Sequence, residues 1–256
     1  MKRAYSLFYH IGKLINREQH VTNKNNKYRH MNYKTLIYLV CLGLLALGFQ
    51  QQQPLPEGFV YAKSVIPDLD LELRYFSTNN FVGDTIEGYK SNVLILTKPT
   101  VEKLKLVQDE LQQQNLCLKV YDGYRPQRAV NHFIRWARAL NDTLKKQTFY
   151  PDVKKRNLFK AGYIASRSGH SRGSTLDLTI TNGETGEPLD MGSPYDFFGE
   201  QSWVAYEDIT KEQKANRQLL QTVMLKHNFR NYPKEWWHFT LRWEPFPETY
   251  FDFEVE

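Results

Sequence analysis

The chain has 256 residues, with 34 Lys and Arg against 28 Asp and Glu, a net charge of +6. Residues 1–48 hold eight of the cations and one of the anions, a net of +7, so residues 49–256 hold 26 cations and 27 anions, a net of −1. The basic character belongs to this leader and does not indicate a nucleic-acid partner for the remainder. A hydrophobic fraction of 41% with only 14 Gly and 11 Pro excludes a disordered or low-complexity chain.

The leader contains an uninterrupted apolar run at 36–49, which is shorter than the about 20 residues that span a bilayer as a helix. Lys34 precedes the run, and Ala46 and Gly48 place small residues where a signal peptidase reads. These features predict an export signal that is removed, without stable membrane insertion afterwards, and therefore a periplasmic protein. The alternative is an uncleaved anchor, in which 36–49 tethers the protein to the membrane.

The expected domain organisation follows from this leader. Residues 1–30 are polar and basic, and we expect translation to start at Met31, with a signal peptide at 31–48. A short linker at 49–56 would lead into one domain at 57–256, a length that suits a single hydrophobic core.

Within that domain, helices and short strands alternate. Apolar residues at helical spacing predict three helices. The first begins at Lys98-Pro99-Thr100 and includes Leu106 among its apolar residues, and the second follows Pro126 and includes Leu140. The third begins at Thr210, which forms a capping box with Gln213. Alternating apolar residues predict strands at 116–121, 176–180 and 236–243. The expected fold class is α+β, a single domain with a central, mostly antiparallel sheet flanked by helices and partly facing solvent.

Four histidines lie in this domain, and His132 and His227 fall on predicted helices, where a structural or solvated role is expected. His170 stands in a Ser- and Gly-rich loop before a strand, and His238 stands at the entry to the last strand. With Asp177 they supply two imidazoles and one carboxylate, the composition of a catalytic zinc site.

Glu235 lies three residues before His238, where its carboxylate could act as a general base beside the metal. From the residues alone a second interpretation stays open, in which Asp177 caps a turn and the two histidines pack separately.

Three separated motifs carry a family resemblance. SGHSRGSTLDLTI at 168–180, YDGYRP at 121–126 and EWWHF at 235–239 together resemble the zinc-dependent D-alanyl-D-alanine dipeptidases, M15 metallopeptidases of the vancomycin-resistance type. Stretches at 71–89, 191–197 and 244–253 are similar to the same family, so the resemblance covers nearly all of 57–256 and implies a Hedgehog/DD-peptidase-like fold. One position departs from the family pattern, where Thr175 stands in place of the usual Ala.

The resemblance implies one Zn²⁺ per chain, bound by His170, Asp177 and His238. It also implies Glu235 as the catalytic base and Arg125 as the group that reaches the scissile carbonyl, although Arg125 could instead form a structural ion pair with Asp122. The implied substrate-binding residues are Asp196 for the substrate ammonium, and Tyr75 and Ser168 as pocket residues.

The expected activity is hydrolysis of the dipeptide D-Ala-D-Ala to two D-alanines by zinc-activated water. One alternative is a peptidoglycan DD- or LD-carboxypeptidase, or an endopeptidase, of the same zinc family. Another is a non-catalytic, zinc-stabilised binding module. Glu235 and Arg125 argue against the second alternative, because a structural metal needs neither a base nor an oxyanion partner.

Overall fold

Five strands form the main sheet in the computed structural model, which describes residues 54–256. The order is β2 (Asp70–Leu71), β4 (Leu116–Asp122), β5 (Thr175–Asn182), β7 (Glu235–Leu241) and β6 (Phe229–Tyr232). β2 runs parallel to β4, and every other neighbouring pair is antiparallel. A separate antiparallel pair joins β1 (Phe59–Tyr61) to β3 (Ile95–Thr97). The predicted mostly antiparallel sheet is confirmed.

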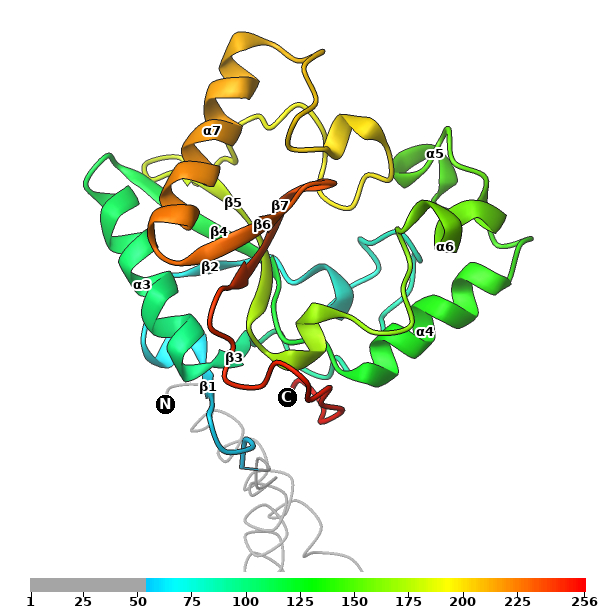
Figure 1. Ribbon diagram of the computed structural model, residues 1–256, viewed down its shortest axis with the longest axis horizontal. Helices are drawn as coiled ribbons and strands as arrows, with labels where there is room; N and C mark the ends of the chain where they lie inside the picture. The colour runs from blue at the N-terminus through cyan, green and yellow to red at the C-terminus, as the bar shows by residue number, and fades with distance from the viewer. Residues whose placement is uncertain (1–53) are drawn as a thin grey trace, which may run out of the picture. The chain divides into compact units, whose positions relative to one another are not determined.

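Helices lie on both sides of this sheet (Figure 1). α3 (Lys98–Gln112) and α7 (Lys211–Lys226) lie on the left in that view, and α4 (Gln127–Arg138), α5 (Lys146–Phe149) and α6 (Leu158–Ala161) lie on the right. Short 3-10 turns are η1 (Ala62–Ser64), η2 (Arg74–Phe76), η3 (Lys155–Asn157), η4 (Gly169–Arg172) and η5 (Glu200–Ser202). The three predicted helices are confirmed as α3, α4 and α7.

Local sequence signals explain where these helices begin. Pro99 occupies the first turn of α3, where its missing N–H removes no helical hydrogen bond. Thr210 Oγ1 accepts from the backbone N–H of Gln213, whose side chain accepts from the backbone N–H of Thr210, so the predicted capping box of α7 is present.

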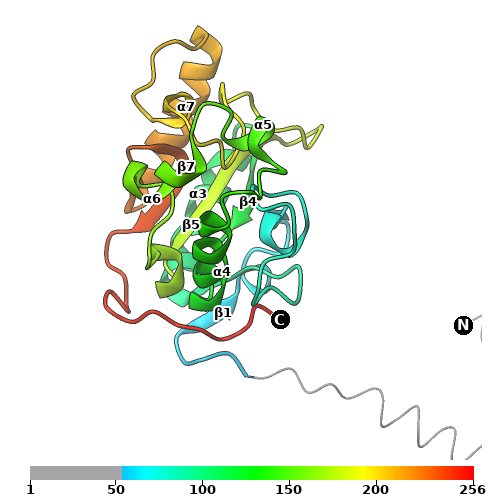
Figure 2. The same ribbon diagram turned by 90° about the vertical axis from the view of Figure 1, so that its right-hand side faces the viewer.

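Two apolar clusters hold the fold together. The first joins α3 and α7 to the sheet, through side chains such as Leu104, Leu178 and Met224. The second is mostly aromatic and surrounds α4, which Figure 2 shows in front of the strands. The central strand β5 is buried from Thr175 to Thr181, whereas the edge strands β2 and β6 have exposed and half-buried residues, so the sheet faces solvent in part, chiefly along its edges.

Three details of the predicted elements are wrong. Leu106 is 44% exposed on α3, and Leu140 is 53% exposed because α4 ends at Arg138. The last strand ends at Leu241, and Trp243 beyond it is 83% exposed. Apolar spacing predicts which face of a helix is buried, but it does not say where the covering element stops.

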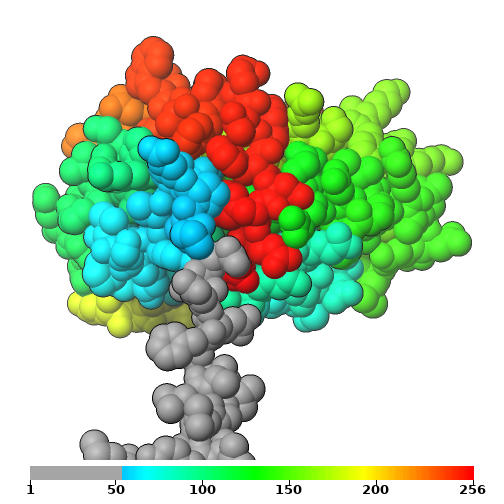
Figure 3. Space-filling model, turned by 90° about the horizontal axis from the view of Figure 1, so that it is seen from below, coloured from blue at the N-terminus to red at the C-terminus, as the bar shows by residue number. Residues whose placement is uncertain are grey.

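The C-terminal segment closes the second cluster. It runs across one face between the N-terminal part of the described chain and the α4 region (Figure 3). Phe253 stacks on Tyr124 at a ring distance of 4.0 Å, and Val255 pairs with Tyr89. Tyr124 directly precedes Arg125, so this packing fixes the backbone that carries one of the predicted site residues.

None of the helices within residues 54–256 is long and apolar enough to cross a membrane. The predicted signal peptide at 31–48 and the alternative anchor at 36–49 lie outside the described residues.

Candidate active site

Two adjacent strands and one tight turn bring the three predicted metal ligands together. Asp177 on β5 pairs directly with His238 on β7. His170 lies on η4, where its backbone N–H donates to the side chain of Ser168, and the turn ends at Gly173 with φ +78°. A Cβ at Gly173 would lie 2.2 Å from the Phe59 ring, so only glycine fits this turn. The turn returns His170 to the side chain of Asp177.

The donor atoms of these ligands form a nearly regular triangle. His170 Nε2 lies 3.3 Å from Asp177 Oδ1 and 3.3 Å from His238 Nδ1, and His238 Nδ1 lies 3.1 Å from Asp177 Oδ1. Tetrahedral zinc with ligand bonds of about 2.0–2.1 Å sets its donors about 3.3 Å apart. The triangle therefore has the dimensions of one face of a tetrahedral metal site.

Hydrogen bonds hold His170 and Asp177 through the atoms that lie outside the donor triangle. His170 Nδ1 lies 2.8 Å from the carbonyl oxygen of Gly123, which fixes its proton on Nδ1 and its lone pair on Nε2. Asp177 Oδ2 accepts from the hydroxyl of Tyr195 at 3.0 Å. Asp177 Oδ1 is buried and receives no hydrogen bond from any residue in 54–256. An orphaned carboxylate oxygen between two imidazole nitrogens fits a bound divalent cation.

Arg125 lies beside the triangle and is held by a carboxylate. Its Nε and Nη2 each lie 2.9 Å from Asp122 Oδ2, and Nη2 lies 3.5 Å from Asp177 Oδ2. Asp122 is itself buried and accepts from the Tyr89 hydroxyl at 2.6 Å. The ion pair with Asp122 and the position beside the metal ligands are thus compatible, because the ion pair orients the guanidinium.

Asp196 forms a second anionic position in the same region. It is 6% exposed, and its Oδ2 accepts from the Tyr75 hydroxyl at 2.9 Å. Burial, reinforced by the charge of Asp177, raises the pKa of Asp196 well above its usual value. A buried carboxylate with this environment is stabilised in its charged form by a cationic ligand.

One cavity of about 290 Å³ collects every predicted site residue. Its lining includes the three ligands and Arg125, Glu235, Asp196, Tyr75 and Ser168. Aromatic side chains of the second cluster, among them Phe81 and Phe133, form part of the wall. The volume is at the lower end for ligand pockets and suits a small molecule.

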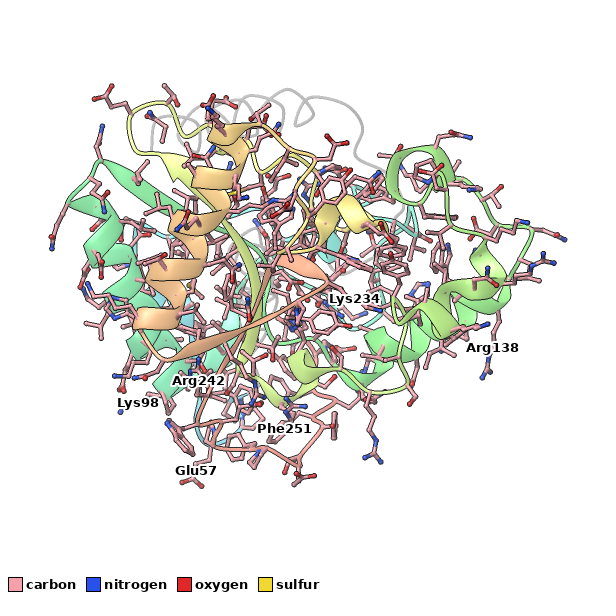
Figure 4. All side chains as sticks on the ribbon, turned by 45° about the horizontal axis from the view of Figure 1, so that its top comes forward. Glu57, Lys98, Arg138, Lys234, Arg242 and Phe251 are labelled. Carbon is pink, nitrogen blue, oxygen red and sulfur yellow. The ribbon has the colours of Figure 1, made fainter. Side chains whose placement is uncertain are left out.

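Glu235 enters this cavity from the start of β7. Its side chain is 23% exposed, and Oε2 lies 3.4 Å from His238 Nδ1, next to the donor triangle and outside it. The preceding residue, Lys234, lies at the turn between β6 and β7 (Figure 4). Its Nζ donates to the carbonyl of Ala161 at 3.0 Å. This bond ties the β6–β7 turn to the end of α6, directly before Gly162, which lines the cavity.

The electrostatics of the site favour cations. Four carboxylates, Asp122, Asp177, Asp196 and Glu235, lie in or beside the cavity, against the two guanidiniums of Arg125 and the exposed Arg167. Burial by itself would raise the pKa of Asp177, but the two imidazoles outweigh it and hold that pKa well below its usual range. Burial lowers the pKa of His238, whereas the carboxylates of Asp177 and Glu235 raise it, to about 9. The remaining excess of negative charge matches a divalent ion.

Thr175, which departs from the family pattern, is not among the residues that line the cavity. It is fully buried, and its Oγ1 lies 2.9 Å from Oγ1 of Thr240, its partner across β5 and β7. The substitution therefore changes the packing beneath the ligands and leaves the cavity wall unaltered.

Three residues that form hydrogen bonds to the site side chains were not predicted. The sequence motifs contain Tyr195, Tyr89 and Gly123, yet their roles depend on contacts with residues far away in the chain. The only sequence signal was their position within stretches that resemble the family. His132 and His227 lie outside the cavity: His132 Nδ1 accepts from the backbone of Glu87, and His227 Nε2 pairs with Glu110 at 2.7 Å.

Two imidazoles and a carboxylate that converge on one point, with a further carboxylate beside them, define the class of metal-dependent hydrolases. The profile of the M15 peptidases, described as D-ala-D-ala dipeptidase, matches residues 56–256. The chain belongs to this metallopeptidase family.

Individual relatives agree with this assignment. The D-alanyl-D-alanine dipeptidase of Enterococcus faecium is 38% identical over 199 residues, which cover 78% of this chain and 98% of the relative. The protein of the same name from Streptomyces coelicolor is 37% identical over 197 residues, 77% of this chain and 98% of the relative. That of Escherichia coli is 32% identical over 177 residues, 69% and 81% respectively. The resemblance inferred from the motifs is confirmed.

Proposed function

We propose that this chain hydrolyses the dipeptide D-Ala-D-Ala to two D-alanines, with one zinc ion per chain held by His170, Asp177 and His238. The observation that carries the proposal is the short path between two buried carboxylates. The Tyr75 hydroxyl lies 2.9 Å from Asp196 Oδ2 and 3.3 Å from the Tyr195 hydroxyl, which lies 3.0 Å from Oδ2 of the metal ligand Asp177, so the two carboxylates are no more than these three contacts apart.

This spacing supports a substrate whose amino group is next to the scissile bond. In a dipeptide the ammonium nitrogen is separated from the peptide carbonyl carbon by a single carbon atom. A carboxylate close to the metal can therefore hold that ammonium while the carbonyl faces the metal. A longer chain on the amino side would put an uncharged amide there and leave Asp196 without its cation, which costs about 1–3 kcal/mol or more.

Zinc at this position would polarise the scissile carbonyl and bring the pKa of a water molecule to about 7. Glu235 lies beside the donor triangle, at 3.4 Å from His238, and we assign it the proton transfer. Its carboxylate takes a proton from the attacking water and returns it to the leaving amine. Arg125, held in orientation by Asp122, stabilises the negative charge that develops on the carbonyl oxygen.

Two further residues complete the proposed substrate site. Tyr75 donates to Asp196 and so fixes the carboxylate that receives the ammonium. Ser168 lines the cavity and also caps the turn that carries His170, since its Oγ accepts from the backbone N–H of His170 at 3.3 Å. We therefore assign Ser168 two roles: it lies beside the substrate, and it holds the turn that carries the metal ligand His170.

We also propose that the protein is exported to the periplasm. The support is the apolar run at 36–49 with Lys34 before it and small residues at its end. Cell fractionation with N-terminal sequencing of the recovered protein tests this proposal. A mature chain that starts near residue 49 agrees with cleavage, whereas an intact chain in the membrane fraction would indicate a tether.

The activity is tested by side-by-side rates of zinc-loaded protein on D-Ala-D-Ala, D-Ala-D-lactate and a stem pentapeptide, with free D-alanine as the readout. We expect D-alanine to be released much faster from D-Ala-D-Ala than from the stem pentapeptide. Faster cleavage of the pentapeptide would replace the dipeptidase with a peptidoglycan carboxypeptidase. Zinc binding without cleavage of any of the three would indicate a binding module.

A further inference from the structure

Tyr195 contacts the metal-ligand carboxylate but has no part in the reaction proposed above. Its side chain is 3% exposed, and its hydroxyl donates to Asp177 Oδ2 at 3.0 Å. The other oxygen of Asp177, Oδ1, is the one that completes the donor triangle. Tyr195 therefore binds the carboxylate oxygen that is turned away from the proposed metal.

The ring of Tyr195 is fixed by its neighbours. It stacks on Tyr121 at a centroid distance of 4.7 Å and meets the Trp237 ring edge-on at 5.4 Å. The guanidinium of Arg74 lies 5.9 Å from the same ring. With the ring buried among these neighbours, the hydroxyl has little freedom to leave Asp177.

The backbone at the next residue explains how Tyr195 and Asp196 serve one site. In an extended chain, consecutive side chains point to opposite sides. Asp196 instead has φ +62°, in the left-handed region. As a result, the Tyr195 hydroxyl and Asp196 Oδ2 both approach the Tyr75 hydroxyl, at 3.3 and 2.9 Å.

A carboxylate ligand with one oxygen held by a hydrogen bond is restricted in how it can bind a metal. Asp177 Oδ2 has a donor in Tyr195 and a guanidinium nitrogen of Arg125 at 3.5 Å, so it is already engaged on the side away from the triangle. Oδ1 alone is free. Partners of this kind set ligand orientation, and their loss typically lowers metal affinity about 10- to 100-fold.

We infer that Tyr195 is a positioning residue, whose hydroxyl holds Asp177 as a single-oxygen metal ligand. The inference rests on the metal site of the proposed function, but not on the identity of the substrate. A phenol keeps its proton at neutral pH, so the donor is present whenever the protein is folded.

The test is Tyr195→Phe, which removes the hydroxyl and keeps the ring packing. We expect zinc affinity, measured by competition with a chromophoric chelator, to fall about 10- to 100-fold. The cobalt-substituted protein should also change its visible absorption, because a released Asp177 can bind through both oxygens and raise the coordination number. Thermal unfolding of the metal-free variant checks that the chain is folded.

Tyr121→Phe is the matched control. It removes a hydroxyl from the ring that stacks on Tyr195, and this hydroxyl forms no hydrogen bond with the three proposed ligands in the described chain. We expect its zinc affinity and cobalt spectrum to match those of the wild type.

An unchanged zinc affinity and cobalt spectrum in folded Tyr195→Phe would overturn the inference and leave the proposed function standing. Failure of the wild type to bind zinc would refute the proposed metal site itself. The two failures are therefore distinguishable.

Discussion

The prediction that most directly tests substrate recognition is Asp196→Asn. This change removes the charge of the buried carboxylate and keeps its shape, and an amide oxygen can still accept from the Tyr75 hydroxyl. Asn also tolerates the left-handed backbone at this position, where φ is +62°. The variant therefore isolates the charge.

The effect on catalysis follows from the loss of one partner of a buried charge pair. Such a loss costs about 2–5 kcal/mol, which corresponds to a fall in kcat/KM of about 30- to 5000-fold. The effect on stability has the opposite sign. Because burial raises the pKa of Asp196 in the folded state, ionisation of this group destabilises the folded protein as pH rises through and above the ordinary carboxyl range. Metal-free Asp196→Asn should therefore unfold at neutral pH at the same temperature as the wild type or a higher one.

The assay compares D-Ala-D-Ala with D-lactyl-D-alanine, in which a hydroxyl replaces the ammonium. We expect the wild type to prefer the ammonium substrate strongly and Asp196→Asn to lose most of that preference. Glu200→Gln is the control, since Glu200 is exposed, lies four residues away and is outside the cavity lining. If Asp196→Asn preferred D-Ala-D-Ala over D-lactyl-D-alanine as strongly as the wild type does, the assignment of Asp196 would be refuted.

Other substitutions test the remaining residues. Glu235→Gln should lower kcat about 10²- to 10⁴-fold while one zinc still binds, because Glu235 lies outside the donor triangle; wild-type turnover would falsify its role as base. Arg125→Lys should reduce kcat/KM about 10²- to 10³-fold, because a lysine ammonium cannot bind Asp122 and also reach the substrate carbonyl, as the guanidinium can. Retained activity in steady-state assays would contradict this role of Arg125. Thr175→Ala should lower the free energy of unfolding, measured in urea, by about 1–3 kcal/mol, because Thr240 loses its buried partner. Its kcat/KM should change only a few-fold, and a much larger loss of activity would show that Thr175 acts on the site.

The chemistry of the site could be predicted from residue type and motif spacing. His170, Asp177, Glu235 and His238 were candidates because imidazole and carboxylate groups are the ligands and bases that zinc hydrolysis requires, and the family resemblance then favoured one shared site over separate packing of the histidines. The beginnings of α3 and α7 were likewise predictable, since Pro99 and the capping box act on the adjacent helical turn.

What required the tertiary structure was the set of relations between distant residues. The pairing of Asp177 with His238 depends on the register of β5 and β7, and a shift of one residue would turn one ligand to the other face of the sheet. The contact of Tyr195 with Asp177 depends on the left-handed φ of Asp196 and on the packing of the Tyr195 ring, neither of which is encoded in a local pattern. The sequence by itself thus determined which chemical groups were available, because side-chain chemistry belongs to single residues. Only the folded chain decided which of those groups meet at hydrogen-bonding distance, because that distance results from the packing of the whole domain.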